Sequence, residues 1–185
     1  NLIIVAGDVI PVSTSTIVKS PYFNHGGDSE AGGGWNYGEV TLGASSANHY
    51  GPVKGAFLDP SDPYYHENYG WLSKENNTND EYIEINYPRQ VYLQSYKMKA
   101  HQNTNYGLTS WIMRGSNNKY IPFTDIESLH TPSEVFNNLA ITEITVSAQI
   151  PYQYYRLYMP KDGTNSRRGL QALDLYTSDE IISSN

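Results

Sequence analysis

The sequence predicts one all-β domain, built as a sandwich or jelly roll, and three observations support this prediction. Residue types that suit a half-buried pleated surface are abundant, and 17 of the 185 residues are tyrosine. Fifteen glycines and ten prolines, with many Asn, Ser and Thr residues, punctuate the chain with turns. No stretch sustains a long amphipathic repeat of 3.6 residues, which argues against a helical bundle.

Short alternating stretches predict the strands in order. They are expected near residues 2–5, 9–12, 15–19, 38–43, 81–87, 91–100, 109–115, 141–149, 152–159 and 170–176. Residues 20–37 and 59–80 are rich in Gly, Pro and acidic residues and are predicted as loops. Both are longer than ordinary connections, so we expect them to be functional or held by something bound.

Two local features refine this strand pattern. Strands 82–87 and 91–100 are predicted to be antiparallel neighbours joined by a turn at 87–90, which places Ile83, Ile85, Val91 and Leu93 in the core. The stretch TPSEVFNNLA has an N-cap residue, Thr131, followed by proline and then glutamate at the third helical position. One short helix is therefore predicted there.

The charge balance narrows the classes of partner. Nineteen acidic residues face 12 basic ones, for a net charge of −7, so the chain lacks the basic field that nucleic acid or an anionic membrane selects. The absence of cysteine excludes a disulfide framework, a thiolate metal site and a cysteine nucleophile. The compartment stays open on this evidence.

Motifs for catalysis are incomplete. HENYG at 66–70 lacks the second histidine of a zinc-protease helix, and GDSEA at 27–31 has alanine where a nucleophile elbow needs glycine. The glycines of GGDSEAGGGWNYG come without the lysine and hydroxyl of a phosphate-binding loop. We therefore predict a protein that is not an enzyme.

Three stretches support a specific resemblance. They are ASSANHYGPVKGAFLDPSD, then EYIEINYPRQVYLQSYKMKA with LTSWIMRGSNN, and finally YQYYRLYMPKDGTNSRRGLQALDLYT. In order and spacing they resemble discoidin, or coagulation-factor type C, domains across about residues 40 to 177. The resemblance implies a galactose-binding-domain-like jelly roll over residues 40–185, preceded by an N-terminal arm or accessory strands at 1–39. The chain departs from the family by an inserted Leu58, a longer stretch from Tyr120 to Thr142 and missing paired cysteines.

Domains of this family use a rigid β scaffold to present loops that bind sugars, lipid head groups or proteins, so the resemblance implies a non-catalytic binding module. Glycans rank first because aromatic, amide and arginine side chains gather in YYHENYGW and NSRRG, and lipid ranks last because the chain is acidic. The predicted ligand-binding residues are Tyr65, His66, Asn68, Tyr106, Arg167 and Arg168.

Alternative roles stay open for these aromatic and basic residues. Trp71 and Trp111 are expected to be core residues, and the loop tyrosines could simply pack the loop onto the scaffold. His66, and His101 just past the strand, are each read as solvated loop histidines. Arg167 and Arg168 are adjacent and point opposite ways in an extended segment, so at most one is expected to face a ligand.

The resemblance also implies a structural calcium ion. In sugar-binding relatives, carboxylates of the Ala-Phe-Asp loop and an acid near the end of the chain hold this ion. The matching positions are Asp59, Asp62 and Asp174, whose oxygens are the donors that a hard cation requires. The alternative is that the two Asp-Pro steps only form turns, and that Asp174 caps a sheet edge or pairs with an arginine.

The competing hypothesis is a structural or assembly module. The apolar segments LIIV and VIPV of residues 1–39 could add a strand to another protein subunit, as in a virion, a fibre or a cell-surface complex. We expect an extracellular, cell-surface or virion-associated location, with an intracellular one as the alternative.

Overall fold

The computed structural model describes residues 16–19, 35–37, 40–47, 53–57, 70–74, 79–146, 150–161 and 167–180. It is an all-β structure with two short 3-10 helices, η1 at Val53–Phe57 and η2 at Thr104–Tyr106. The strands are β1 Val18–Lys19, β2 Trp35–Tyr37, β3 Val40–Ala44, β4 Trp71–Leu72, β5 Glu81–Ala100, β6 Ile112–Ser116, β7 Thr124–Asp125, β8 Ile141–Thr145, β9 Tyr152–Met159 and β10 Gly169–Ser178. The predicted jelly-roll sandwich is confirmed in the described residues.

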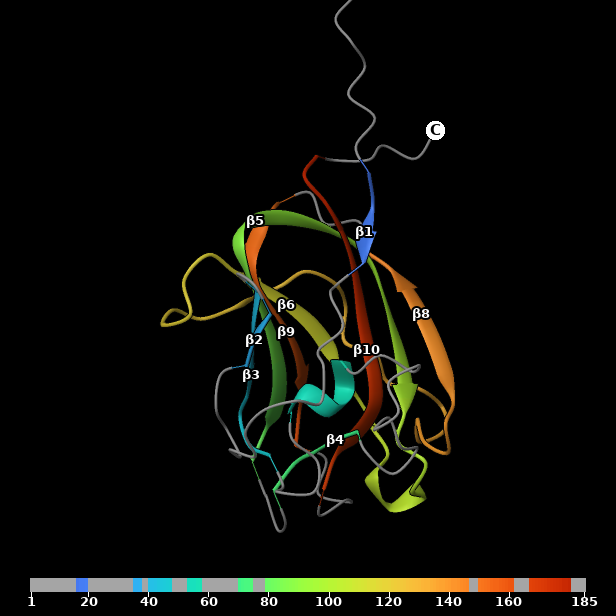
Figure 1. Cartoon of the computed structure of the whole chain (residues 1–185). Helices are drawn as coiled ribbons and strands as arrows, with labels where there is room; N and C mark the ends of the chain where they lie inside the picture. The colour runs from blue at the N-terminus through green and yellow to red at the C-terminus, as the bar shows by residue number, and fades with distance from the viewer. Residues whose placement is uncertain are drawn as a thin grey trace, which may run out of the picture.

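All strand pairs are antiparallel and form two layers joined by β5. One layer contains β1, β10, β4, β8 and the second half of β5. The other contains β2, β3, β9, β6, β7 and the first half of β5. Figure 1 shows β5 arching over one end of the molecule, between β9 on one side and β10 and β8 on the other.

The predicted turn at 87–90 is wrong, because β5 is one strand of 20 residues that passes from one layer into the other. Residues 81–86 pair with β9, and residues 92–100 pair with β10. Pro88 has no N–H to donate, and it lies with two other exposed residues in the part of β5 that crosses between layers. The two halves therefore face each other across the core instead of lying side by side.

A single tyrosine holds this crossing in place. The buried Tyr155 hydroxyl donates to Val91 O at 2.5 Å and accepts from the backbone N–H of Leu93 at 3.1 Å and of Tyr152 at 3.3 Å. These bonds satisfy backbone groups where the ladder between β5 and β9 is irregular, between Asn86 and Val91.

Alternation along β5 builds the core from both layers. Ile83, Ile85, Val91 and Leu93 are all buried, as the sequence predicts, and they belong to one hydrophobic cluster with residues of β9 and β10. Trp71 and Trp111 belong to the same cluster, at 0% and 4% exposure, which confirms their expected place in the core.

The predicted helix at Thr131 is wrong. Phe136 instead forms an isolated antiparallel bridge, exchanging two backbone hydrogen bonds with Leu108 at 2.9 and 3.0 Å. Its side chain packs against Trp111, with ring centroids 5.4 Å apart. These tertiary contacts outweigh the local preference of a Thr-Pro-Ser-Glu start for a helix.

The described residues of 1–39 form β1 and β2, apart from Thr16 and Ile17, which directly precede β1. β1 pairs with the end of β10, and β2 pairs with β3. Residues 35–37 and 71–72 form short strands within the two segments predicted as loops. The strands predicted at 2–5 and 9–12 lie outside the described residues, and the domain boundary at residue 39 stays a prediction.

Candidate functional site

Strand pairing brings β4 and the start of β10 together, and each of them lies next in sequence to one of the predicted loops. β4 directly follows residues 61–69 in sequence, and it pairs with the start of β10, which follows residues 162–166. Two further bonds of 2.8 Å join these strands, from Ser73 N–H to Arg168 O and from Arg168 N–H to the Ser73 hydroxyl. The end of β5 also reaches this point, because Ala100 pairs with Leu170.

Three side chains form a cluster at this end. The ring of Tyr106, in η2, lies edge-on to the ring of His101, with centroids 5.3 Å apart. The guanidinium carbon of Arg167 lies 5.6 Å from the centroid of the same tyrosine ring, and Nη1 is 3.5 Å from its hydroxyl. Two of the predicted ligand-binding residues, Tyr106 and Arg167, therefore lie together although 61 positions separate them in sequence.

His101 is the member of this cluster that sequence reasoning misassigned. It is only 4% exposed, so the expectation of a solvated loop histidine is wrong. Gly169 permits this burial, since a Cβ at that position would lie 3.2 Å from His101 Cβ and 2.7 Å from Leu72 Cδ2. The alternation along β5 gave no signal for this burial, because it places position 101 on the same face as the half-buried Lys97 and Lys99.

The protonation state of His101 follows from its surroundings. Burial lowers the pKa of the imidazole, which is therefore neutral at pH 7. Nδ1 accepts a hydrogen bond from Asn103 N–H at 3.0 Å, so the ring proton lies on Nε2. Among the described residues, buried Nε2 has no hydrogen-bond partner. The cluster thus combines an aromatic ring, a cation and a neutral histidine.

The two adjacent arginines differ in exposure. Arg168 is 2% exposed, and its Nη2 donates to Pro160 O at 2.8 Å. Its charge contributes to lowering the pKa of Asp80, although hydrogen bonds from the Tyr158 hydroxyl and from Lys161 N–H lower it more. Of the pair, Arg167 is the one whose side chain is half-buried beside Tyr106.

Several predicted site residues lie outside the described residues. They are the loop residues Tyr65, His66 and Asn68 and the calcium candidates Asp59 and Asp62. Asp174, the third calcium candidate, lies on β10 and forms an ion pair of 3.0 Å with Lys19 of β1. Within the described ranges, no three His, Cys, Asp or Glu side chains gather closely enough to hold a metal ion. The calcium site stays a prediction that depends on Asp59 and Asp62.

Comparison with solved structures identifies the fold. A family 32 carbohydrate-binding module of NanJ from Clostridium perfringens, in complex with galactose, superposes with a TM-score of 0.58 at 18% identity, covering 75% of this chain and 93% of that one. An F5/8 type C domain from Bacteroides fragilis gives a TM-score of 0.59 at 13% identity, with 81% and 98% covered. The chain has the discoidin, or F5/8 type C, fold.

A further solved structure shares this fold at low sequence identity. A chitosan-binding module from a Paenibacillus chitosanase/glucanase matches with a TM-score of 0.56 at 20% identity, covering 75% of this chain and 95% of that module. No protein-family model and no curated protein sequence matches the chain. Within the described residues, no helix has the length and apolar character needed to span a membrane.

Proposed function

We propose that the protein is a non-catalytic carbohydrate-binding module that recognises a glycan at the end of the sandwich where β4, β5, η2 and β10 meet. The observation that carries the proposal is the placement of Arg167 over Tyr106, beside the strand that follows residues 61–69. The discoidin fold supports it, because the similar structures include a module in complex with galactose and one that binds chitosan.

The chemistry of this cluster suits a neutral sugar. An aromatic face covers the C–H groups of a pyranose, while a guanidinium presents several N–H donors in a fixed plane to its hydroxyls. Tyr65, His66 and Asn68 are the further ligand-binding residues of the proposal, whereas the buried Arg168 supports the site by bonding to Pro160 O and to Ser73. Binding of this kind needs no nucleophile or general base. A location outside the cell, or on a cell or virion surface, is part of the proposal.

A glycan array followed by calorimetry tests this proposal. The protein should bind galactose-containing or amino-sugar glycans, and Arg167→Ala and Tyr106→Ala should each weaken binding at least tenfold. Tyr120→Ala is a matched control, since this tyrosine is 83% exposed and lies in the connection between β6 and β7. The control should bind as the unmodified protein does.

Two outcomes would overturn the proposal. One is the absence of measurable binding to any glycan by the folded protein, which would favour the assembly module in which residues 1–39 contact another subunit. The other is glycan binding that Arg167→Ala and Tyr106→Ala leave unchanged. Circular dichroism of each variant distinguishes loss of binding from loss of fold.

A further inference from the structure

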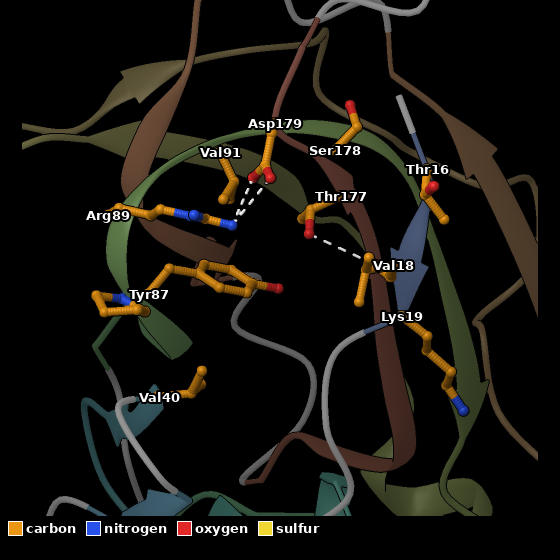
Figure 2. Close-up of a pocket in the computed structure, with 11 residues that line it drawn as sticks. Thr16, Val18, Lys19, Val40, Tyr87, Arg89, Val91, Thr177, Ser178 and Asp179 are labelled. Atoms are coloured by element: carbon orange, nitrogen blue, oxygen red, sulfur yellow. Dashed lines mark hydrogen bonds and ion pairs between the residues drawn. The ribbon is translucent and has the colours of Figure 1, made fainter. Parts of the chain in front are cut away.

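A pocket lies at the other end of the sandwich, where β5 crosses between the layers. It has a volume of about 530 Å³ and is lined by residues in or directly beside β1, β3, β5 and β10, among them Val18, Tyr87, Arg89, Val91, Thr177 and Asp179 (Figure 2). Ser178, which lines it, lies eight residues along β10 from Leu170 at the first cluster, roughly 26 Å at the rise of an extended strand. The two sites are therefore separate.

A buried tyrosine hydroxyl points into this pocket. Tyr87 is 7% exposed, and its side chain is directed toward Thr177 (Figure 2). Among the described residues, its hydroxyl oxygen has no partner within hydrogen-bond geometry. Burial raises the pKa of this hydroxyl more than a longer hydrogen bond with Thr177, outside that geometry, lowers it, so the group stays protonated. A ligand atom could both accept from this hydroxyl and donate to it, which would satisfy a buried polar group.

The mouth of the pocket carries an ion pair, and the other lining cation, Lys19, is paired with Asp174 at 3.0 Å. Arg89 Nη2 lies 2.8 Å from Asp179 Oδ1 and 2.9 Å from Oδ2, and both side chains are largely exposed. Because the two charges cancel, the mouth favours neither an anion nor a cation. The guanidinium and the carboxylate keep further donor and acceptor positions, which suit hydroxyl or amide groups of a neutral ligand.

Apolar side chains form the rest of the wall. Val18, Val40 and Val91 reach the pocket from β1, β3 and β5, and Pro88 adds a fourth apolar surface. The volume falls within the range of small-molecule sites, which are mostly apolar with a few directed polar groups. The ligand should therefore have an apolar edge as well as hydroxyl groups.

We propose that this pocket is a second binding site, for a neutral hexose or N-acetylhexosamine unit, and that the protein is a bivalent module with one site at each end. The choice of sugar as the ligand rests on the proposed function, but the place of the pocket and its polar groups do not. In the bound state the Tyr87 and Thr177 hydroxyls contact the sugar hydroxyls, and the Arg89–Asp179 pair closes over the outer ones. Two sites about a sandwich length apart would bridge neighbouring glycans and increase avidity.

Nuclear magnetic resonance of the isotope-labelled protein tests both ends in one titration. Adding galactose or N-acetylgalactosamine should shift amide signals of Tyr87, of residues 89–91 and of residues 177–179, and separately those near residues 101–106 and 167. Tyr87→Phe keeps the ring and removes the hydroxyl, so it should weaken binding at the pocket at least tenfold while the first cluster still responds. Arg167→Ala should do the reverse.

Arg89→Ala gives a second variant whose exposed position leaves the core intact, and it should also weaken binding at the pocket at least tenfold. Shifts confined to the Tyr106 and Arg167 end would overturn the second site and leave the proposed function standing. Shifts confined to residues 87–91 and 177–179 would support the second site and overturn the placement of the first. Pocket shifts that persist unchanged in both Tyr87→Phe and Arg89→Ala would also overturn this proposal.

Discussion

At the scale of single residues, burial decides the chemistry of the polar groups. His101 and Tyr87 lie near opposite ends of the scaffold. The ring centroids of His101 and Tyr106 are 5.3 Å apart, and those of Tyr87 and Tyr155 are 6.2 Å apart. Burial lowers the pKa of the histidine and raises that of Tyr87, and in both cases it keeps the side chain neutral. Neutral groups with unused hydrogen-bonding capacity suit recognition of neutral ligands.

The lowered pKa of His101 predicts a dependence of stability on pH. Below its unfolded pKa of about 6.5, the unfolded chain binds a proton that the folded chain does not, so the free energy of unfolding falls as pH decreases toward the folded pKa. His101→Asn, whose side-chain oxygen can still accept from Asn103 N–H, should reduce this fall. Urea unfolding of both proteins at pH 7.5 and 5.5 measures it. Equal pH dependence in the two proteins would contradict the prediction.

At the scale of elements, contacts between segments distant in sequence determine the conformation of stretches in which the residue pattern predicts no regular structure. The connection between β6 and β8 is held by Glu127, whose Oε1 accepts from the Tyr96 hydroxyl at 2.6 Å and from Met113 N–H at 2.8 Å. In the same connection, His130 stacks on Trp111 with centroids 5.4 Å apart. A long stretch without a helix is thereby attached to the core of the sandwich.

Two strand glycines form a matched pair for testing the packing of these elements. At Gly115 of β6 a Cβ would lie 2.2 Å from the Tyr152 ring, whereas at Gly43 of β3 it would lie 3.6 Å from Glu84 Oε1. Gly115→Ala should lower the free energy of unfolding by about 1 to 3 kcal/mol through overpacking. Gly43→Ala should leave it unchanged or raise it by up to about 1 kcal/mol, because alanine restricts the unfolded chain. Chemical denaturation measures both, and equal effects would refute this account.

At the scale of the whole molecule, the two-layered sandwich has two ends, and each end carries a different candidate site. One end collects residues from β4, β5, η2 and β10. β5 arches over the other end (Figure 1), and residues of this arch line the pocket. The proposed function places a glycan at the first end, and the second proposal places another at the pocket, so substitutions at one end should not alter binding at the other. Independence is expected because the sites are separated by the length of a rigid sandwich.

The predicted calcium site concerns the whole molecule, because its proposed ligands come from distant parts of the chain. Asp174 pairs with Lys19, so Asp59 and Asp62 carry the prediction. If the ion binds, calcium at about 100 times its dissociation constant stabilises the fold by about 2.7 kcal/mol, which raises the melting temperature by roughly 5 to 10 °C. A chelator should reverse the rise, and Asp59→Ala with Asp62→Ala should abolish it. Magnesium at the same concentration is the control. An unchanged melting curve, with no copurified ion, would show that the protein binds no structural calcium.

Much of the candidate site depends on strand pairing that sequence spacing does not reveal. Tyr106 and Arg167 were singled out from their residue types, but their contact depends on η2 and the start of β10 meeting at the end of β5. His101 was misjudged because a histidine beside polar residues is usually solvated, and only the close approach of Gly169 shows why it is buried. Tyr87 was assigned to a turn because proline follows it.

The sequence by itself determined the all-β class, the positions of most strands and the inward faces of β5, because alternation of apolar and polar residues with a period of two depends only on local order. It also determined the discoidin resemblance, through three stretches in the right sequence order. Only the tertiary structure decided that β5 is continuous, that Phe136 is extended and that the pocket exists. Each of these follows from hydrogen bonds and packing between segments far apart in the chain, whose energies exceed local propensities of a few tenths of a kcal/mol to about 1 kcal/mol per residue.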